Sequence, residues 1–345
     1  MAASSVGNQV QPSRVDLTVD CHRLHGDSFS GVRVLVTGGG GFIGSHLSEV
    51  LGRLGASVVI LDDLSAGSRA NVEAASPAEF VHGSIVDVDA VRRATAGCRY
   101  VFHQAALGSV PRSLEHPRLY GEVNAQGTVN VLDAARHAGV ERVMFAASSS
   151  AYGENPVPWV ETMQPRPRSP YAATKVAGEA MLRAYALNYA PLDTVSLRYF
   201  NIFGPRQNAN SAYAAVIAAF AKNLLAGKNP VVFGDGTTSR DFTYVDNAVH
   251  ANLLAARAPR RLDGEAVNVA CGGRVSLNDL AARMAKSWKR PDLTPVYQPE
   301  RKGDLRHSFA NVAKARELLG YAPIVGFEPG LDATLAWYES ELRPR

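Results

Sequence analysis

A short apolar segment that runs into three evenly spaced glycines constrains this chain more than any other feature. Residues 32–36 are mostly apolar and rich in valine, and Gly38, Gly41 and Gly44 follow at intervals of three. Such a segment predicts a buried strand, and the helical spacing of residues 45–54 predicts a helix directly after the glycines. The glycines would permit a tight turn, close approach of a ligand to the backbone and close packing of the helix on the strand.

Further apolar segments of strand length follow along the chain, and helical stretches lie between them. The second of these segments, residues 57–61, closes at Asp62 and Asp63. The other strands are expected at 80–81, 100–102, 142–146 and 194–197, and the longest helices at 127–138 and 174–189. Strands that alternate with helices predict a mostly parallel, doubly wound α/β sheet.

Length, charge and cysteine content exclude several classes of protein. The chain has 345 residues, enough for one large or two joined domains, and a net charge of only +4 without any long run of Lys or Arg. This balance gives no indication of nucleic-acid binding. The three cysteines, Cys21, Cys98 and Cys271, are few and far apart, which favours a reducing compartment over a disulfide framework or a cysteine-based metal site. For the same reason we expect no metal. We also expect no membrane partner and a cytoplasmic location, because we find neither an apolar span nor a signal peptide.

The glycine turn predicts a site for a dinucleotide. Free N–H groups at the start of the helix would bind its diphosphate. Asp62 ends the second strand, 24 positions after Gly38, where a carboxylate accepts hydrogen bonds from the adenosine ribose. The carboxylate would repel a 2′-phosphate, so NAD is favoured over NADP. The alternative, that Asp62 only begins a turn, stays open.

We therefore expect a Rossmann-type domain that binds NAD and a second, smaller domain. The first would span residues 31–200, and residues 241–271 would return to it. After residue 200 glycine, proline and asparagine become frequent and the elements shorten. We expect residues 201–240 and 272–345 to form a mixed α/β domain for the substrate, closing over the carboxyl edge of the sheet. Residues 1–30 are interpreted as a tail or extension, because they carry no strong periodicity.

A tyrosine and a lysine four positions apart predict a redox site. Tyr171 and Lys175 would share one face of a helix, and Ser148 precedes Tyr171 by 23 positions. A free phenol has a pKa of about 10 and is a poor base at neutral pH, but a neighbouring ammonium group and the nicotinamide cation would lower that pKa. Tyr171 could then take the proton of a sugar hydroxyl while the carbon gives hydride to NAD.

With these motifs in this order, the chain resembles the extended short-chain dehydrogenase/reductase family from about Val32 onward. The resemblance implies that Ser148 holds and polarises the reacting hydroxyl, that Tyr171 is the acid/base, and that Lys175 binds the nicotinamide ribose and tunes Tyr171. It also implies a homodimer that pairs through helices 127–138 and 174–189. Their periodicity would equally suit burial within one subunit.

The same resemblance implies further contacts to NAD. Phe42 and Ile43 belong to the glycine turn. Gln104, Ala105 and Ala106 would follow the nicotinamide half of the cofactor, and Asn124 would lie near it. At the end of the third strand, Ser84 and Ile85 would face the adenine. The family often has an acid where Ser84 stands, but a hydroxyl can still accept a hydrogen bond.

The chain resembles UDP-N-acetylglucosamine 4-epimerases most closely, in residues 106–113, 212–217 and 303–308. Two arginines, Arg240 and Arg301, suit a diphosphate because guanidinium groups make paired, charge-assisted hydrogen bonds; pairing with surface acids is the alternative. Asp304 could accept from the uridine ribose. Ser308 matches the position beside the sugar pocket, where a small residue leaves room for a 2-acetamido group. Other positions that match the pocket are Gly108, Ser109, Ser149, Asn201, Gln207 and Ala215.

The reaction that this resemblance implies is epimerisation at C4 through a 4-keto sugar, with NAD retained. Dehydratases and decarboxylases of the family carry carboxylates where Ser149 and Ser150 stand here, so no acid for elimination is evident. UDP-GlcNAc and UDP-GalNAc are the expected substrates. Alternatives are a 4-epimerase for UDP-glucose or UDP-uronic acids, and a non-catalytic NAD sensor, since a fold alone never proves activity.

Overall fold

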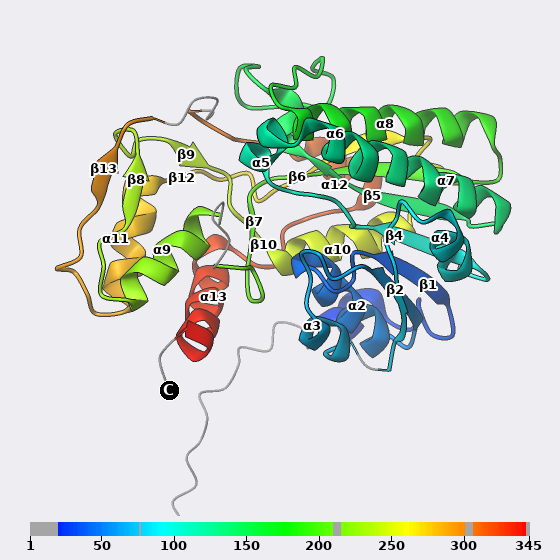
Figure 1. Cartoon of the computed structure of the whole chain (residues 1–345), viewed down its shortest axis with the longest axis horizontal. Coiled ribbons are helices and arrows are strands. Elements are labelled where there is room, and N and C mark those ends of the chain that lie inside the picture. The colour runs from blue at the N-terminus through cyan, green and yellow to red at the C-terminus, as the bar shows by residue number, and fades with distance from the viewer. Residues whose placement is uncertain (1–19, 76, 210–214, 301–305, 343–345) are drawn as a thin grey trace, which may run out of the picture.

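A seven-stranded parallel sheet forms the centre of the computed structural model, which describes residues 20–75, 77–209, 215–300 and 306–342 (Figure 1). The strand order is β11-β6-β5-β4-β1-β2-β3, and every neighbouring pair is parallel. The strands are β1 (Arg33–Thr37), β2 (Ser57–Asp62), β3 (Glu79–His82), β4 (Tyr100–His103), β5 (Arg142–Ser148), β6 (Asp193–Tyr199) and β11 (Glu265–Val269). The predicted fold class, a doubly wound sheet of Rossmann type, is confirmed.

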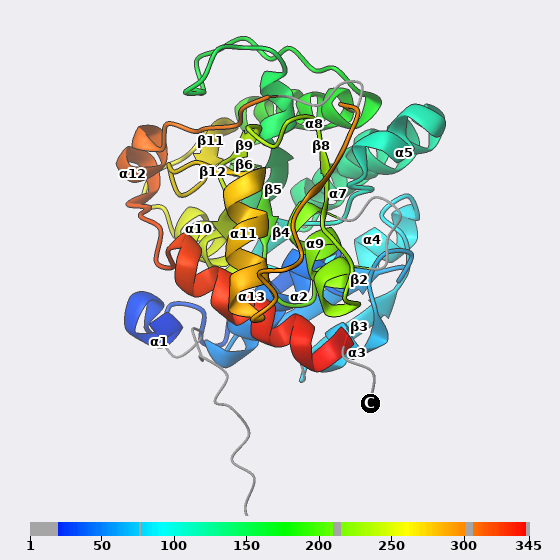
Figure 2. The same ribbon diagram turned by 90° about the vertical axis from the view of Figure 1, so that its left-hand side faces the viewer.

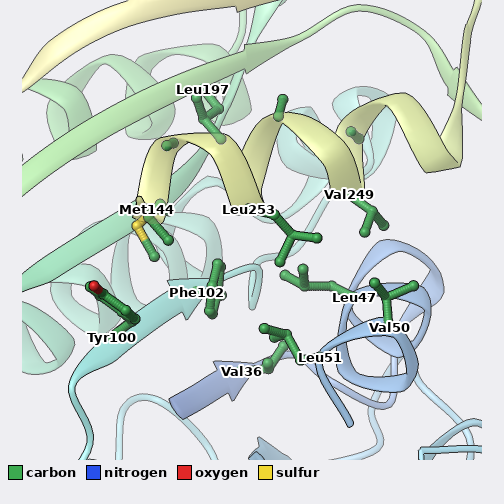
Figure 3. Close-up of a cluster of buried hydrophobic side chains, with 14 of the residues drawn as sticks. Val36, Leu47, Val50, Leu51, Tyr100, Phe102, Met144, Leu197, Val249 and Leu253 are labelled. Carbon is green, nitrogen blue, oxygen red and sulfur yellow. The ribbon is translucent and has the colours of Figure 1, made fainter. Parts of the chain in front are cut away.

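Helices cover both faces of this sheet. One face carries α2 (Phe42–Arg53) and α10 (Val245–Ala256), and the other carries α4 (Val88–Thr95), α7 (Gly127–His137) and α8 (Pro170–Asn188). Figure 3 shows the first interface, where Leu47 and Leu51 of α2 and Leu253 of α10 meet Val36 and Phe102 of the sheet. Helix α2 begins three residues earlier than its apolar periodicity predicts, because the turn of backbone after Gly41 is already helical.

The strand order reverses between β1 and β4, which is where such sheets bind ligands. The chain passes from β1 to β2 and β3 on one side, and from β4 to β5 and β6 on the other. Because all these strands are parallel, their carboxyl ends meet at one edge. The residues singled out from the sequence follow those ends: Gly38 after β1, Asp62 in β2, Gln104 after β4 and Ser148 in β5.

A smaller group of elements packs beside the carboxyl edge around a hydrophobic cluster of its own (Figure 2). Its helices are α9 (Val216–Leu225), α11 (Leu277–Ser287) and α13 (Phe327–Leu342). Its short strand pairs are β8 (Val231–Phe233) with β13 (Val296–Gln298), and β9 (Ser239–Arg240) with β12 (Val275–Ser276). A third pair, β7 (Ile202–Phe203) with β10 (Thr243–Tyr244), connects this group to the sheet.

Two segments pack differently from the expected division. Helix α12 (Ala313–Leu319) was expected in the smaller domain, but Ala315 and Leu319 belong to the hydrophobic cluster of the large sheet. Residues 20–30, the end of the segment interpreted as a tail or extension, pack on the large sheet: α1 (Asp20–His25) is followed by Phe29, which is fully buried in the same cluster. This segment contacts residues about 70 to 225 positions away, Tyr100 and His250 among them. Such distant contacts cannot be predicted from the periodicity of the segment itself.

The remaining short elements lie along the edges of this framework. They are α3 (Arg69–Glu73), α5 (Val110–Glu115), α6 (Pro117–Tyr120), the π-helical turn η2 (Gly121–Gln126) and the 3-10 turn η3 (Ser149–Tyr152). Within the described ranges, no helix is both long and apolar enough to cross a membrane.

Candidate active site

A cavity of about 1220 Å³ lies at the carboxyl edge of the sheet. It collects most of the residues that the sequence singles out. From the expected cofactor set it is lined by Gly38, Gly41, Phe42, Ile43, Gly44, Asp62, Ser84, Ile85, Gln104, Ala105 and Ala106; from the catalytic set by Ser148, Tyr171 and Lys175; and from the substrate set by Gly108, Ser149, Asn201, Gln207, Arg240 and Ser308.

The glycine turn leaves a cradle that any side chain would fill. Gly38 has a φ of 71°, and a Cβ there would lie 2.6 Å from the backbone nitrogen of Ala105. At Gly44 a Cβ would lie 2.1 Å from the carbonyl oxygen of Gly38. Both positions are therefore restricted to glycine by backbone atoms. The turn and the N-terminus of α2 fit a dinucleotide diphosphate, which needs close approach to free N–H groups.

Asp62 closes β2 beside this turn. One carboxylate oxygen accepts the Gly40 N–H at 2.8 Å and the other accepts the Leu64 N–H at 2.7 Å. Burial raises the pKa of the Asp62 carboxyl, while these two hydrogen bonds act in the opposite direction. The carboxylate therefore organises the turn that follows it and also lines the cavity, so the two interpretations of Asp62 are compatible.

Ser148 and Tyr171 come from different elements and meet at the cavity. Ser148 ends β5, and its hydroxyl accepts the N–H of Ser150 at 3.2 Å. Tyr171 lies in the first turn of α8, which Ser169 caps by accepting the N–H of Ala172. The side chains of Tyr171 and Ser148 share a hydrogen bond, which lowers the pKa of the phenol, whereas burial, the larger effect, raises it. Without a further positive charge the phenol is thus a weaker acid than usual.

Lys175 is buried one turn further along α8, with 3% of its surface exposed. Its Nζ donates to the carbonyl oxygen of Ala146 at 2.7 Å and lies 5.9 Å from the centre of the Tyr171 ring. Burial lowers the pKa of Lys175 to about 7, and the charge of Glu179 raises it. An ammonium group at this place would favour the phenolate of Tyr171.

Beside the expected nicotinamide loop lies a triangle of hydrogen bonds. The Tyr199 hydroxyl donates to Gln104 at 3.1 Å, Asn252 donates to the Tyr199 oxygen at 2.6 Å, and Gln104 donates to Asn252 at 3.2 Å. Tyr199 lines the cavity as well. It fixes the Gln104 amide against β6, which the sequence did not indicate because the three residues lie up to 148 positions apart.

On the substrate side, Ser308 is held by two neighbouring segments. Its hydroxyl accepts from the Asn201 amide at 3.2 Å, and its N–H donates to the carbonyl oxygen of Ser239 at 3.1 Å. Arg240 follows Ser239 and lines the cavity. Gln207 donates to the Ile202 carbonyl at 3.0 Å. The pocket wall is therefore built from small and amide side chains, with a guanidinium nearby.

Five expected site residues are not among those that line the cavity. Asn124 is buried behind the loop, where it accepts the Leu107 N–H at 2.8 Å and donates to Thr174. Ser109 caps α5 by accepting the Arg112 N–H. Ala215 is exposed just before α9. Arg301 and Asp304 lie outside the described residues.

Several large side chains that line the cavity were not anticipated as site residues, among them Trp159, Arg168 and Phe233. Phe233 opens the glycine-rich segment 233–236 and could have been included on that ground. Trp159 and Arg168 stand in an irregular segment without any local signal. Arg168 forms an ion pair with Glu154. In the described ranges, no group of three or more His, Cys, Asp or Glu side chains could hold a metal ion.

Comparisons with known proteins identify the class. Residues 34–270 match the NAD dependent epimerase/dehydratase family. The UDP-glucose 4-epimerase of Mycolicibacterium smegmatis is 40% identical over 316 residues, which cover 90% of this chain and 99% of that protein. The chain therefore belongs to the NAD dependent epimerase/dehydratase family, as its resemblance to extended short-chain dehydrogenases predicts. It is an enzyme of the isomerase class that uses NAD.

Two solved structures are similar over nearly their whole length. The UDP-N-acetylglucosamine 4-epimerase from Methanobrevibacter ruminantium M1, in complex with UDP-N-acetylmuramic acid, has a TM-score of 0.86 at 37% identity and covers 90% of this chain and 99% of its own. The UDP-glucose 4-epimerase of Thermus thermophilus, in complex with NAD, has a TM-score of 0.80 at 37% identity, with coverages of 89% and 99%.

Proposed function

We propose that this enzyme is a UDP-sugar 4-epimerase that interconverts UDP-GlcNAc and UDP-GalNAc, and that it also accepts UDP-glucose and UDP-galactose. The observation that carries the proposal is the small side chain of Ser308 in the wall of the same cavity as Tyr171 and Lys175. A site with a small residue there has room for a 2-acetamido group. The relatives and solved structures named above, all UDP-sugar 4-epimerases, support the same class of substrate.

In this proposal Tyr171 moves the proton. It takes the proton of the sugar 4-hydroxyl, which Ser148 holds by hydrogen bonding, and the carbon becomes a ketone. The glycine turn and Asp62 would hold NAD, which would supply the reversible hydride transfer that this chemistry requires. Lys175 supplies the positive charge that makes the phenol a usable base at neutral pH. Once the keto sugar has turned over, Tyr171 returns the proton to the new 4-hydroxyl.

The dimensions of the cavity support this cycle. Its volume of about 1220 Å³ exceeds the roughly 300–1,000 Å³ of an ordinary single-ligand site, as expected for a dinucleotide together with a nucleotide sugar. We propose that Arg240 binds the diphosphate and that Asn201 and Gln207 face the sugar. Arg301 and Asp304 remain proposed contacts to UDP on the basis of the sequence.

The distribution of carboxylates argues for epimerisation rather than elimination. Among the described residues that line the cavity, the carboxylates are Asp62 and Asp63, and both lie at the nucleotide end beside the glycine turn. Ser149 and Ser150 occupy the places beside Ser148. A sugar held near Tyr171 would therefore meet no acid suited to expelling water.

A second substrate class, UDP-uronic acids, is favoured by one observation. Arg168 lines the cavity two residues before α8, and a guanidinium can bind a carboxylate through two parallel hydrogen bonds. Its pairing with Glu154 would have to be exchanged for the sugar carboxylate. We therefore rank this class below the acetylated sugars.

We also propose that two copies pair through the helices around α7 and α8. Met181, Leu187 and Tyr189 are large apolar or aromatic residues in and just after α8, and each is at least 41% exposed. Large apolar side chains exposed on these helices would be buried if two copies paired there. Sedimentation equilibrium of the wild-type enzyme would measure the mass of the particle directly, and a monomer at micromolar concentration would contradict this proposal.

The decisive experiment incubates the pure enzyme with UDP-GlcNAc and resolves the products by chromatography. We expect UDP-GalNAc to form without added reductant or oxidant. Replacing Ser308→Tyr should lower kcat/KM for UDP-GlcNAc by on the order of 100-fold relative to UDP-glucose, since pockets discriminate between ligands that differ by single groups by roughly 10–200-fold. Ser308→Ala, which keeps the space, is the control. If wild-type enzyme forms no UDP-GalNAc, the proposed substrate is wrong.

A further inference from the structure

A buried ion pair joins the two elements that carry the proposed catalytic residues. Arg198, near the carboxyl end of β6, is 3% exposed, and Glu179 on α8 is 8% exposed. The guanidinium donates through Nε and Nη2 to the two carboxylate oxygens of Glu179, at 2.8 and 2.7 Å. The same guanidinium lies 4.7 Å from the centre of the Tyr152 ring. Arg198 therefore contacts both α8, which carries Tyr171, and η3.

The turn η3 is the element that positions Ser148. It starts at the residue after Ser148 and ends at Tyr152, which is fully buried. The Tyr152 hydroxyl donates to Asn268 of β11 at 2.6 Å. Because the ring is fixed at this end and covered by Arg198 on its face, the turn has little freedom to move relative to β6.

Glu179 also stands one helical turn after Lys175. Residues four apart on a helix lie on the same face, and the negative charge of Glu179 raises the pKa of Lys175 against the effect of burial. The Lys175 ammonium reaches Ala146 of β5 at 2.7 Å. The Ala146 carbonyl oxygen through a hydrogen bond, and the Glu179 carboxylate through its charge, both favour the charged form of Lys175.

The other titratable groups around this pair do not replace Glu179. His103 on β4 faces Lys175, but burial lowers the pKa of this histidine to about 3, so it is neutral at the pH of interest. Tyr171 shares α8, and Tyr120 at the end of α6 acts on Tyr171 by raising the pKa of its phenol. Arg198 on β6 is cationic and would oppose the charge of Lys175 if Glu179 were absent.

We propose that Glu179, which is hydrogen-bonded to Arg198, is a positioning residue for the reaction. It keeps Lys175 charged and directed toward Tyr171, while Arg198 holds the turn that follows Ser148. The proposal rests on the roles proposed above for Tyr171 and Lys175. Replacing a buried ion pair by apolar residues of similar size often leaves stability unchanged or increases it. A pair that served packing alone could thus be exchanged without cost, whereas a pair that sets the charge of Lys175 could not.

The test compares three variants of the NAD-loaded enzyme with wild type. The double variant Glu179→Gln with Arg198→Met removes both charges, so neither charge is left buried without its counter-charge. Glu179→Asp keeps the carboxylate. Glu161→Gln is the matched control, because Glu161 accepts the N–H of Asn268 on the far side of Tyr152 and its charge acts on Tyr152. Far-ultraviolet circular dichroism and thermal melts establish that each variant is folded.

The first measurement follows the Tyr171 phenolate by ultraviolet difference spectroscopy, with Tyr171→Phe versions of each protein as blanks. In the double variant we expect Lys175 to lose part of its positive charge, and the midpoint of the Tyr171 titration to rise by about one pH unit as a result, since a neighbouring charge shifts a pKa by about 1–3 units. Glu179→Asp, which keeps the carboxylate, should stay close to the wild-type midpoint, and Glu161→Gln should leave it unchanged. This measurement needs no sugar, so it tests the inference even if the proposed substrate is wrong.

The second measurement is kinetic. At pH 7 the double variant should lose about tenfold in kcat, matching a one-unit shift in the phenolate midpoint, with KM for the sugar changed less than threefold and kcat recovering as the pH rises by one unit. A folded double variant whose phenolate midpoint stays at the wild-type value would overturn the inference, as would a loss of kcat that is the same at every pH. Either result would assign the pair to packing.

Discussion

The substitution Gly44→Ala tests the link between the glycine turn and the cofactor most directly. A Cβ at position 44 would lie 2.1 Å from the Gly38 oxygen, whereas ordinary contact begins at 3.4 Å, a shortfall of 1.3 Å. The atom it meets belongs to the backbone, so no side-chain rotation relieves the overlap. Overpacking costs about 1–3 kcal/mol, and we expect the upper end, which corresponds to a change of roughly 100-fold in an equilibrium constant.

The affinity for NAD should fall by about that factor, because α2 must move away from the strand and its N–H groups then no longer converge on the diphosphate. The assay measures the NAD content of the purified protein and its thermal unfolding with and without added NAD. Gly52→Ala on the same helix is the control: its Cβ would meet nothing closer than 3.9 Å, and alanine inside a helix is favoured over glycine by about 0.5–1 kcal/mol. A Gly44→Ala protein with wild-type NAD content and the same response to NAD would show that the close contact at Gly44 does not control cofactor binding.

Three further outcomes follow from the structure. Tyr171→Phe should lower kcat by about 10²–10⁴-fold while the protein retains NAD, as measured by turnover and by release of the cofactor on denaturation. Asp193→Asn should reduce the free energy of unfolding by about 3–5 kcal/mol, as measured by urea unfolding. In the wild-type protein the buried Arg142 guanidinium donates to the Asp193 carboxylate at 2.8 Å, and the variant leaves this guanidinium without a counter-charge. Burial lowers the pKa of His25 and of His250 from 6.5 to about 4. The unfolded chain therefore binds protons at a higher pH than the folded protein, and the free energy of unfolding falls as the pH drops from 6.5 toward 4. Thermal unfolding measured across this range should show a smaller decrease in stability for His25→Gln than for wild type.

The sequence predicts those parts of the site that depend on local pattern. The run of valines before Gly38 and the acid at Asp62 are separated by one helix, and the parallel sheet that they predict places both at one edge. Tyr171 and Lys175 are joined by a single helical turn. In each case short-range geometry determines the arrangement, and the cavity contains all four residues.

Contacts between distant segments were beyond local pattern. Phe29 stands in a segment without periodicity, and its burial depends on Tyr100, with ring centres 6.3 Å apart. Asn124 was expected at the cofactor, but its amide is used within the protein to hold Leu107. Asn124 would therefore affect a ligand indirectly, through the backbone of the loop 104–108. A resemblance to a family cannot distinguish this indirect role from direct contact.

The loop that carries Gln207, a proposed sugar contact, is fixed to the helix that follows the glycine turn. His46 on α2 hydrogen-bonds the carbonyl oxygen of Pro205 at 2.9 Å, and Arg206 forms an ion pair with Glu49 of the same helix. Since α2 also begins at the glycine turn, Gln207 and the NAD site belong to one rigid arrangement. If the proposed epimerisation is correct, hydride must therefore reach both faces of the sugar without movement of this wall. The sugar has to turn over while its nucleotide stays bound, and the pocket must hold the ring by few contacts, which agrees with the small side chain of Ser308.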